Sequence, residues 1–290
     1  MNLNVEAQYW QSKASKENKD VACVLCPHSC LVKVDQVGFC GVRENREGVL
    51  FASSYGAVTS LALDPIEKKP LYHFQRGKKI VSIGGYGCNF RCGYCQNHKI
   101  SIEYKKAKID FMYPEMIAQF AIATKKDGNI GIAYTYNEPL ISYEFIHDCA
   151  VYAKKAGLMN VLVTNGYINK EPLKKLLPLI DAMNIDIKAF DERTYNKFGG
   201  RLEPVLDAVQ TASGTCHVEL TTLVLPGDNE NDIERIARWI ARIDQNIPFH
   251  LSRFYPRHEY INKQPTPFET MHRAKAVAEN YLTYVYLGNM

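Results

Sequence analysis

Residues 79–97 read KIVSIGGYGCNFRCGYCQN. An apolar run leads into a glycine-rich loop that carries three cysteines spaced C-x3-C-x2-C, namely Cys88, Cys92 and Cys95. Thiolates are the usual protein ligands of iron–sulfur clusters. Three thiolates for four irons leave one iron without a protein ligand, and such an iron can bind and activate a substrate. A zinc site or a set of packed thiols is the less favoured alternative for this spacing.

The composition restricts the class of protein. The chain has 290 residues, a net charge of +4 and an apolar fraction of 46%, which is ordinary for a globular protein. The weak positive charge gives no reason to expect a nucleic-acid partner. No apolar run reaches the roughly 18 residues that span a bilayer, and residues 1–20 lack the apolar core of a signal peptide. We therefore expect a cytoplasmic protein without a membrane partner, whose clustered cysteines bind metal instead of forming disulfides.

Strand and helix patterns alternate from residue 78 onward. Strands are expected at residues 79–84, 131–136, 160–164, 182–187, 217–225 and 249–254, with a further candidate at 283–287. Helices are expected at residues 114–126, 142–156, 171–179, 202–213, 232–243 and 270–281. This alternation predicts an α/β fold with a parallel sheet and crossover helices, and six strands fit a partial (β/α)6 barrel. We assign residues 77–290 to this barrel and residues 1–76 to a Cys-rich metal-binding region and a connector. Within the connector, residues 64–74 are interpreted as a packed linker more than as a lid over the barrel.

A second set of cysteines precedes the barrel, with the spacing C-x2-C-x3-C-x9-C: Cys23, Cys26, Cys30 and Cys40. Four thiols so close together predict either a closed tetrahedral zinc site or an auxiliary iron–sulfur cluster, with His28 as a substitute ligand. We favour zinc slightly, because a small region with little apolar content needs a bound metal or a cross-link for stability. Four protein ligands also leave no open position for chemistry. Unligated reduced thiols are the remaining alternative.

Polar residues follow several of the predicted strands, where barrel proteins place their working residues. Glu138, in the segment YTYNEP of residues 134–139, can accept hydrogen bonds from a cationic amine or cap the next helix. Asn165 follows the third strand and can orient a ligand or simply form a turn. Asp186 and Lys188 lie two residues apart on the fourth strand, so both face the same side. Opposite charges on an inward face are costly unless they bind a ligand or each other.

The cysteine loop, with Tyr94 before its last cysteine, resembles the motif of radical S-adenosylmethionine (radical SAM) enzymes. The resemblance implies a partial barrel and a 4Fe-4S cluster held by the three cysteines, with the amine and carboxylate of SAM on the fourth iron. Glu138 lies in a turn similar to the G-G-E-P turn that holds the methionyl amine, although Tyr136 and Asn137 replace the two glycines. The D-x-K strand resembles that of glycyl-radical activating enzymes. It implies that Lys188 binds the SAM carboxylate and Asp186 an ammonium or hydroxyl group, with Tyr94 and Asn165 as further cofactor-binding residues.

The closer resemblance is to relatives of pyruvate formate-lyase activating enzyme. The segments CVLCPHSC (23–30), DPIEKKPL (64–71) and YTYNEP are also similar to the AmmeMemoRadiSam-system radical SAM family. That family is named for its pairing with Memo-like and AMMECR1-like proteins, which become candidate partners beside a protein substrate and a reductant such as flavodoxin or ferredoxin.

The function that this resemblance implies is the reductive cleavage of SAM to a 5′-deoxyadenosyl radical, which then modifies or activates a protein or peptide. One alternative is transfer of a SAM-derived group, of the aminocarboxypropyl type, to a small molecule or protein. A non-catalytic iron–sulfur or zinc scaffold is the last alternative, and an open-coordination motif aligned with charged strand ends argues against it.

Overall fold

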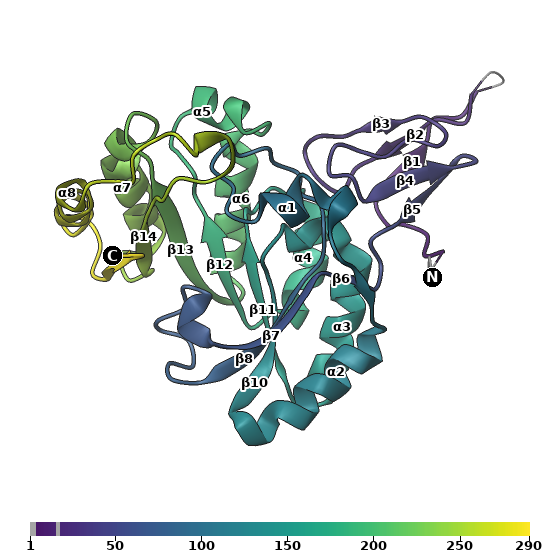
Figure 1. Cartoon of the computed structure of the whole chain (residues 1–290), viewed down its shortest axis with the longest axis horizontal. Coiled ribbons are helices and arrows are strands. Elements are labelled where there is room, and N and C mark those ends of the chain that lie inside the picture. Colours follow the sequence, from purple (N-terminus) through teal and green to yellow (C-terminus); the bar gives the residue numbers. More distant parts are fainter. Residues whose placement is uncertain (1–3, 16–17) are drawn as a thin grey trace.

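A computed structural model describes residues 4–15 and 18–290 of the chain, and its centre is one eight-stranded sheet (Figure 1). The strand order is β15-β14-β13-β12-β11-β10-β8-β7. All neighbours from β8 to β15 pair in parallel, and only β7 is antiparallel to its neighbour. The strands of this sheet are β7 (Ser60–Pro65), β8 (Lys79–Gly84), β10 (Asn129–Tyr134), β11 (Met159–Thr164), β12 (Ala182–Asp186), β13 (His217–Val224), β14 (Phe249–Arg253) and β15 (Val285–Gly288).

Helices connect consecutive parallel strands and pack along the sheet (Figure 1). They are α2 (Pro114–Ala123), α3 (Tyr143–Lys155), α4 (Lys170–Leu176), α6 (Leu202–Ser213), α7 (Ile233–Asp244) and α8 (Phe268–Ala278), with the short α1 (His98–Ser101) and α5 (Glu192–Lys197) in loops. Helix α2 begins with a proline, whose missing N–H is not needed in the first turn. Its buried residues, among them Ile117 and Ala121, recur at helical spacing and face the sheet. The predicted α/β fold with a parallel sheet is therefore confirmed.

The differences from the expected elements are small and have local causes. The expected helix at 171–179 is α4 followed by a 3-10 turn over Leu177–Leu179, because Pro178 cannot continue the α-helical hydrogen bonding. Strand β7 lies in the region assigned to the connector, and it joins the main sheet beside β8. The sheet itself thus begins before residue 77.

The connector after β7 packs across the inside of the open barrel. The backbone N–H groups of Tyr72 and His73 donate to the buried carboxylate of Glu219 on β13, at 2.9 and 2.7 Å. The side chain of Asn184 on β12 donates to the carbonyl of Pro70 at 2.8 Å. The connector is therefore anchored to the middle of the sheet, as a packed linker would be.

The N-terminal strands form small sheets at one end of the molecule (Figure 1). Strands β1 (Trp10–Ser12), β2 (Val21–Cys23) and β3 (Leu31–Val32) form one sheet, β4 (Arg43–Arg46) and β5 (Val49–Ala52) a hairpin, and β6 (Ala57–Val58) pairs with β9 (Asp110–Phe111). Arg43 joins this part to the barrel, because its guanidinium forms two 3.1 Å contacts with Glu144 on α3. Both side chains are almost fully buried. None of the described helices is both long enough and apolar enough to cross a lipid bilayer.

Candidate active site

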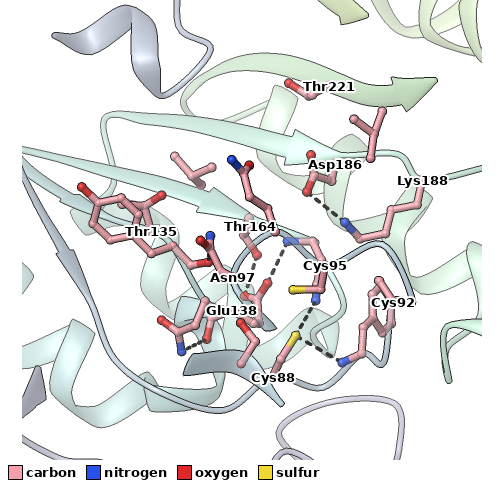
Figure 2. Close-up of a pocket in the computed structure, with 18 of the residues that line it drawn as sticks. Cys88, Cys92, Cys95, Asn97, Thr135, Glu138, Thr164, Asp186, Lys188 and Thr221 are labelled. Carbon is pink, nitrogen blue, oxygen red and sulfur yellow. Dashed lines mark hydrogen bonds and ion pairs between the residues drawn. The ribbon is translucent and has the colours of Figure 1, made fainter. Parts of the chain in front are cut away.

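A cavity of about 480 Å³ opens where the parallel strands end (Figure 2). In a parallel sheet all carboxyl ends lie at one edge, so residues far apart in the sequence meet there. The cavity is lined by all three cysteines of the motif loop and by every strand-end residue singled out above: Cys88, Cys92, Cys95, Tyr94, Glu138, Asn165, Asp186 and Lys188. The structure thus brings these eight residues together, whereas Cys23, Cys26, Cys30 and Cys40 are not among the residues that line this cavity.

The motif loop is fixed by backbone contacts on both sides. Gly87 has a φ of +81°, and a Cβ at this position would lie 2.5 Å from the carbonyl oxygen of Cys40, so only glycine fits. The N–H of Arg91 donates to the carbonyl of Phe198 at 2.7 Å. The sulfur of Cys88 accepts the N–H of Phe90 at 3.3 Å. These contacts fix the loop to the neighbouring parts of the chain.

Burial disfavours the free thiolate form of all three motif cysteines. Burial raises the pKa of Cys92 to about 11, while the positive charge of Lys188 acts in the opposite direction. Burial also raises the pKa of Cys88 and Cys95. A bound metal deprotonates its thiol ligands outright, so these sulfurs suit a metal cluster better than they suit free nucleophiles.

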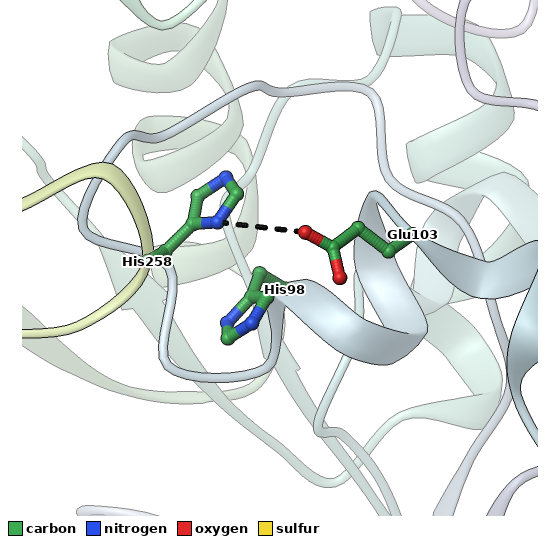
Figure 3. A group of neighbouring side chains, drawn as sticks. All are labelled: His98, Glu103 and His258. Carbon is green, nitrogen blue, oxygen red and sulfur yellow. Dashed lines mark ion pairs between the residues drawn. The ribbon is translucent and has the colours of Figure 1, made fainter.

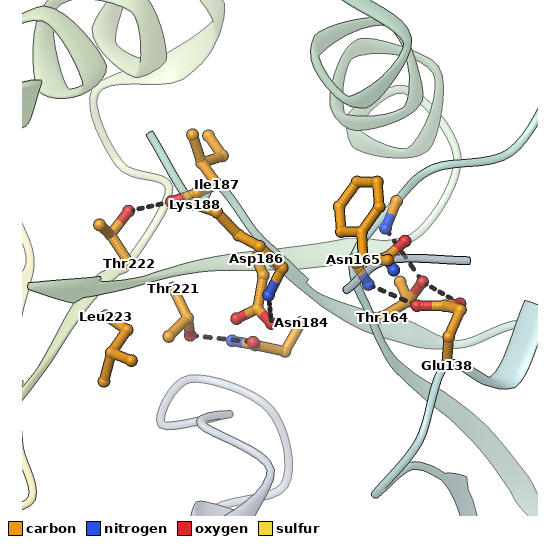
Figure 4. Close-up of polar contacts among 12 residues, drawn as sticks. Glu138, Thr164, Asn165, Asn184, Asp186, Ile187, Lys188, Thr221, Thr222 and Leu223 are labelled. Carbon is orange, nitrogen blue, oxygen red and sulfur yellow. Dashed lines mark hydrogen bonds and ion pairs between the residues drawn. The ribbon is translucent and has the colours of Figure 1, made fainter. Parts of the chain in front are cut away.

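Glu138 joins the ends of two strands. One carboxylate oxygen accepts the N–H of Leu140 at 2.9 Å and the hydroxyl of Thr164 at 2.7 Å, and the other accepts the N–H of Asn165 at 2.8 Å (Figure 4). The side chain is only 3% exposed, and this burial raises its pKa to about 7. Glu138 therefore caps the 3-10 turn over Pro139–Ser142 and holds the ends of β10 and β11 together, while it still lines the cavity.

Asn165 forms a turn and also reaches the cysteine loop. Its side-chain oxygen accepts the N–H of Tyr167 at 2.9 Å, as in an Asx turn. Its amide nitrogen donates to the side-chain oxygen of Asn89 at 2.8 Å and lies 3.9 Å from the sulfur of Cys88. The two roles left open for this residue are thus compatible, and the amide places β11 against the motif loop.

Asp186, the last residue of β12, and Lys188, two residues beyond it, face the cavity and pair with each other at 3.0 Å (Figure 2). Burial alone would lower the pKa of Lys188, but the charge of Asp186 outweighs it and raises the pKa well above its usual value. The lysine is therefore cationic at neutral pH. Asp186 is the more exposed partner, so a ligand that enters the cavity meets its carboxylate first.

The connector supplies cavity residues that the sequence interpretation missed. Lys68 and Lys69 line the cavity, and Lys69 is 3% exposed, 2.9 Å from Asp64. The hydroxyl of Tyr136 donates to the same carboxylate at 2.7 Å. Burial alone would raise the pKa of Asp64, but the hydrogen bonds from Lys69, Tyr136 and Lys68 lower it. The two adjacent lysines, Lys68 and Lys69, lie in a segment that the sequence predicts to be a linker. They are the sequence feature that could have indicated these cavity residues.

A second polar group lies beside the motif loop (Figure 3). Among the described residues, one set of three or more His, Cys, Asp or Glu side chains has all its ligand atoms within 4.8 Å, and it consists of His98, Glu103 and His258. The two imidazole rings stack with their centroids 4.5 Å apart, and a ring nitrogen of His98 contacts the carbonyl of Cys95 at 3.1 Å. The group joins α1 to the loop after β14, and sequence spacing does not reveal it.

The fold and the site define a partial barrel whose strand ends surround three thiols and a cavity. A model of the Radical SAM superfamily matches residues 82–240, which is more than half of the chain. The chain therefore belongs to the radical SAM superfamily.

Relatives and solved structures agree with this assignment. An uncharacterized protein of Methanocaldococcus jannaschii is 43% identical over 94% of this chain and 83% of its own length. The pyruvate formate-lyase 1-activating enzyme of Escherichia coli K12 is 24% identical over 67% of this chain and 86% of its own length. Streptococcus suis SuiB bound to precursor peptide SuiA superposes with a TM-score of 0.57 at 11% identity, over 70% of this chain and 47% of that chain, and supports the fold.

Family membership makes this protein an enzyme that uses a 4Fe-4S cluster and SAM as cofactors. The site fits both. Three sulfurs from one loop line a cavity that also holds a carboxylate and an ammonium group. These are the charges that complement the carboxylate and amine of an amino-acid ligand.

Proposed function

We propose that Cys88, Cys92 and Cys95 hold the cluster and that SAM binds beside it, in the cavity at the strand ends. The cluster, when bound and reduced, supplies the electron that splits SAM into methionine and a 5′-deoxyadenosyl radical. The radical then removes a hydrogen atom from a protein or peptide. The observation that carries this proposal is the placement of the three sulfurs and the Asp186–Lys188 pair on the wall of one cavity.

The residues around the cavity orient the cofactor. Lys188 binds the carboxylate of SAM, and Asp186, released from the ion pair, accepts hydrogen bonds from its ammonium or ribose hydroxyl groups. Tyr94 is buried against Phe198 and supplies an apolar surface beside the cysteines. Glu138 and Asn165 act mainly as positioning residues, because most of their polar atoms already bind neighbouring strand ends.

A macromolecular substrate is supported by homology to an enzyme whose name describes the activation of pyruvate formate-lyase. We assign the chain to the AmmeMemoRadiSam-system family on its CPH, DPIEKKPL and YTYNEP segments. Memo-like and AMMECR1-like proteins are the partners this assignment names, and a flavodoxin or ferredoxin is the reductant. In this scheme residues 77–290 are the catalytic barrel, and residues 1–76 are an accessory region.

Transfer of an aminocarboxypropyl-type group is the second candidate, and the turn after β10 favours it. Tyr136 stands where the resembled turn has glycine, adopts a φ of +73°, and points its hydroxyl to Asp64. A side chain at this turn changes the space next to the SAM amine. SAM then binds in a different orientation, and a different carbon–sulfur bond faces the cluster.

Isotope transfer from the substrate tests the proposal. The reduced enzyme is incubated anaerobically with SAM and the macromolecular fraction of a lysate grown in deuterated medium. We expect 5′-deoxyadenosine that carries one deuterium, and no label when the small-molecule filtrate of the undigested lysate replaces the macromolecular fraction. Label from the small-molecule fraction alone would overturn the protein substrate. 5′-Methylthioadenosine as the product would establish group transfer instead.

A further inference from the structure

The four N-terminal cysteines lie together, but not as a single metal ion requires. Cys23, Cys26 and Cys40 are buried and Cys30 is half-buried, and none of them forms a disulfide. In a zinc site all four sulfurs bind one ion at about 2.3 Å, so they stand roughly 3.8 Å from one another. No three of these four sulfurs lie within 4.8 Å of each other, because the single described set that meets this condition is the histidine group of Figure 3. The quartet is therefore wider than a zinc site.

The motif cysteines of the barrel provide an internal reference for this spacing. Cys88, Cys92 and Cys95 also fail the 4.8 Å condition, although they carry the family's cluster motif. In a four-iron cluster each thiolate binds a different iron, so the sulfurs stand farther apart than around one ion. The quartet and the motif cysteines thus both lack the close packing of sulfurs that a single ion requires.

Each cysteine set also has a sulfur that accepts a backbone hydrogen bond. In the quartet, the sulfur of Cys30 accepts the N–H of Phe39 at 3.5 Å. In the motif loop, the sulfur of Cys88 accepts the N–H of Phe90 at 3.3 Å. Backbone N–H groups aimed at sulfur stabilise thiolate ligands and tune the reduction potential of a cluster.

The quartet packs directly against the motif loop. The carbonyl of Cys40 lies so close to Gly87, the residue before Cys88, that no side chain fits between them. A ring nitrogen of His28 contacts the carbonyl of Asn89 at 2.8 Å. The guanidinium of Arg91 lies over the ring of Phe39 at 4.3 Å. His28 is therefore a bridge between the two loops, which gives it a role other than the substitute ligand considered above.

We propose that Cys23, Cys26, Cys30 and Cys40 bind an iron–sulfur cluster, not zinc, and that this cluster exchanges electrons with the one in the barrel. This reverses the slight preference for zinc that the cysteine spacing alone supports. The electron balance is simple: a one-electron donor of the flavodoxin or ferredoxin class reduces the N-terminal cluster. That cluster returns to its oxidised state as the barrel cluster gains the same electron. No bond to sulfur is formed or broken in this step.

Metal analysis of a barrel-deficient variant tests the identity of the metal. The Cys88→Ala/Cys92→Ala/Cys95→Ala protein is made and purified anaerobically, with no iron or sulfide added afterwards. We expect iron with an equal amount of acid-labile sulfide, almost no zinc, and a paramagnetic signal that appears on reduction with dithionite. A further Cys26→Ala change should remove all of these, whereas Cys216→Ala, at an isolated cysteine, should leave them unchanged.

Zinc without iron, or no metal at all, in a folded barrel-deficient variant would overturn the proposal. If that variant does not fold, the test is made on the wild-type protein. Purified in the same way, it should contain about twice the iron of a Cys30→Ser variant. When both clusters are reduced, their paramagnetic signals should broaden each other, as neighbouring spins do. Iron that is unchanged in the Cys30→Ser variant, together with a single unbroadened signal, contradicts the proposal. These readouts do not depend on SAM cleavage, so they can fail while the proposed function holds.

Discussion

The two cysteine sites of this molecule differ in what surrounds them. The motif cysteines line a cavity that also carries the Asp186–Lys188 pair, so a ligand can approach them. The quartet is enclosed by short strands and by the motif loop itself, with one half-buried sulfur. Three ligands beside a cavity suit chemistry on a substrate, whereas four enclosed ligands suit structure or electron transfer. In our proposal, the number of thiols and the space next to them, more than the presence of cysteine, separate the two roles.

Removal of one motif cysteine should have the largest effect. Cys92→Ala should reduce SAM cleavage to the background level, because the cluster loses one of its three protein ligands. The metal of the quartet should remain. Nucleoside products and metal content measured on the same sample check both statements, with Cys216→Ala as the matched control. Cleavage that persists in Cys92→Ala would refute the site.

The contact between the two regions can be broken at Arg43. Arg43→Met leaves the buried carboxylate of Glu144 without its partner, and removing one half of a buried ion pair costs about 3–5 kcal/mol. The double variant Arg43→Met/Glu144→Leu should recover much of that loss, since no unpaired charge remains. Urea unfolding followed at the quartet chromophore and by circular dichroism checks this. Equal stabilities for the single and double variants would contradict the assigned coupling.

The hydrogen bonds between the connector and Glu219 should make the stability of the protein depend on pH. Burial alone would raise the pKa of Glu219, but hydrogen bonds from His217, His250 and the connector backbone lower it to about 2. A carboxyl with a lowered pKa contributes stability that is fully present above its unfolded pKa of about 4.3 and is lost as the pH falls through about 2. The shift corresponds to about 3 kcal/mol.

Glu219→Gln should therefore lower the free energy of unfolding at pH 7 and flatten its fall between pH 4.5 and 2, on the scale of these two pKa values. Thermal unfolding across that range measures the effect. The exposed Glu203→Gln is the matched control and should leave the curve in place. If the free energy of unfolding falls between pH 4.5 and 2 in Glu219→Gln as it does in the wild type, the connector is not held by this carboxylate.

The smallest expected effect concerns the cofactor pocket. Lys188→Ala should weaken SAM binding about 10- to 100-fold, the range expected for a lost hydrogen bond to a charged group, and leave the iron content unchanged. Equilibrium binding of SAM to the anaerobic protein measures it. Lys197→Ala, at an exposed lysine of α5, should bind SAM as the wild type does. Unaltered affinity in Lys188→Ala would remove this residue from the site.

Much of the fold could be predicted from the sequence because alternating strand and helix patterns leave few topologies. Strand β8 and helix α6 match their predicted bounds, and Asp186 and Lys188 share a face because strands have a period of two. The parallel topology also explains why the strand-end residues meet in one cavity.

The parts that the sequence did not reveal depend on long-range contacts. Lys69 enters the cavity because its connector is anchored to Glu219, which lies about 150 residues later in the chain. Glu138 has neighbours on β11 that no local pattern indicates. The width of the quartet, which decides between zinc and a cluster in our account, is likewise a distance between loops and not a spacing along the chain.

We infer that the open cysteine site, and not the enclosed one, cleaves SAM. The most direct test is to reduce the wild-type protein and the Cys88→Ala/Cys92→Ala/Cys95→Ala variant with dithionite, add SAM, and identify the nucleoside by mass. We predict 5′-deoxyadenosine from the wild type and none from the variant. Equal amounts of 5′-deoxyadenosine from both proteins, or no cleavage by wild-type protein that contains the cluster, would contradict the account.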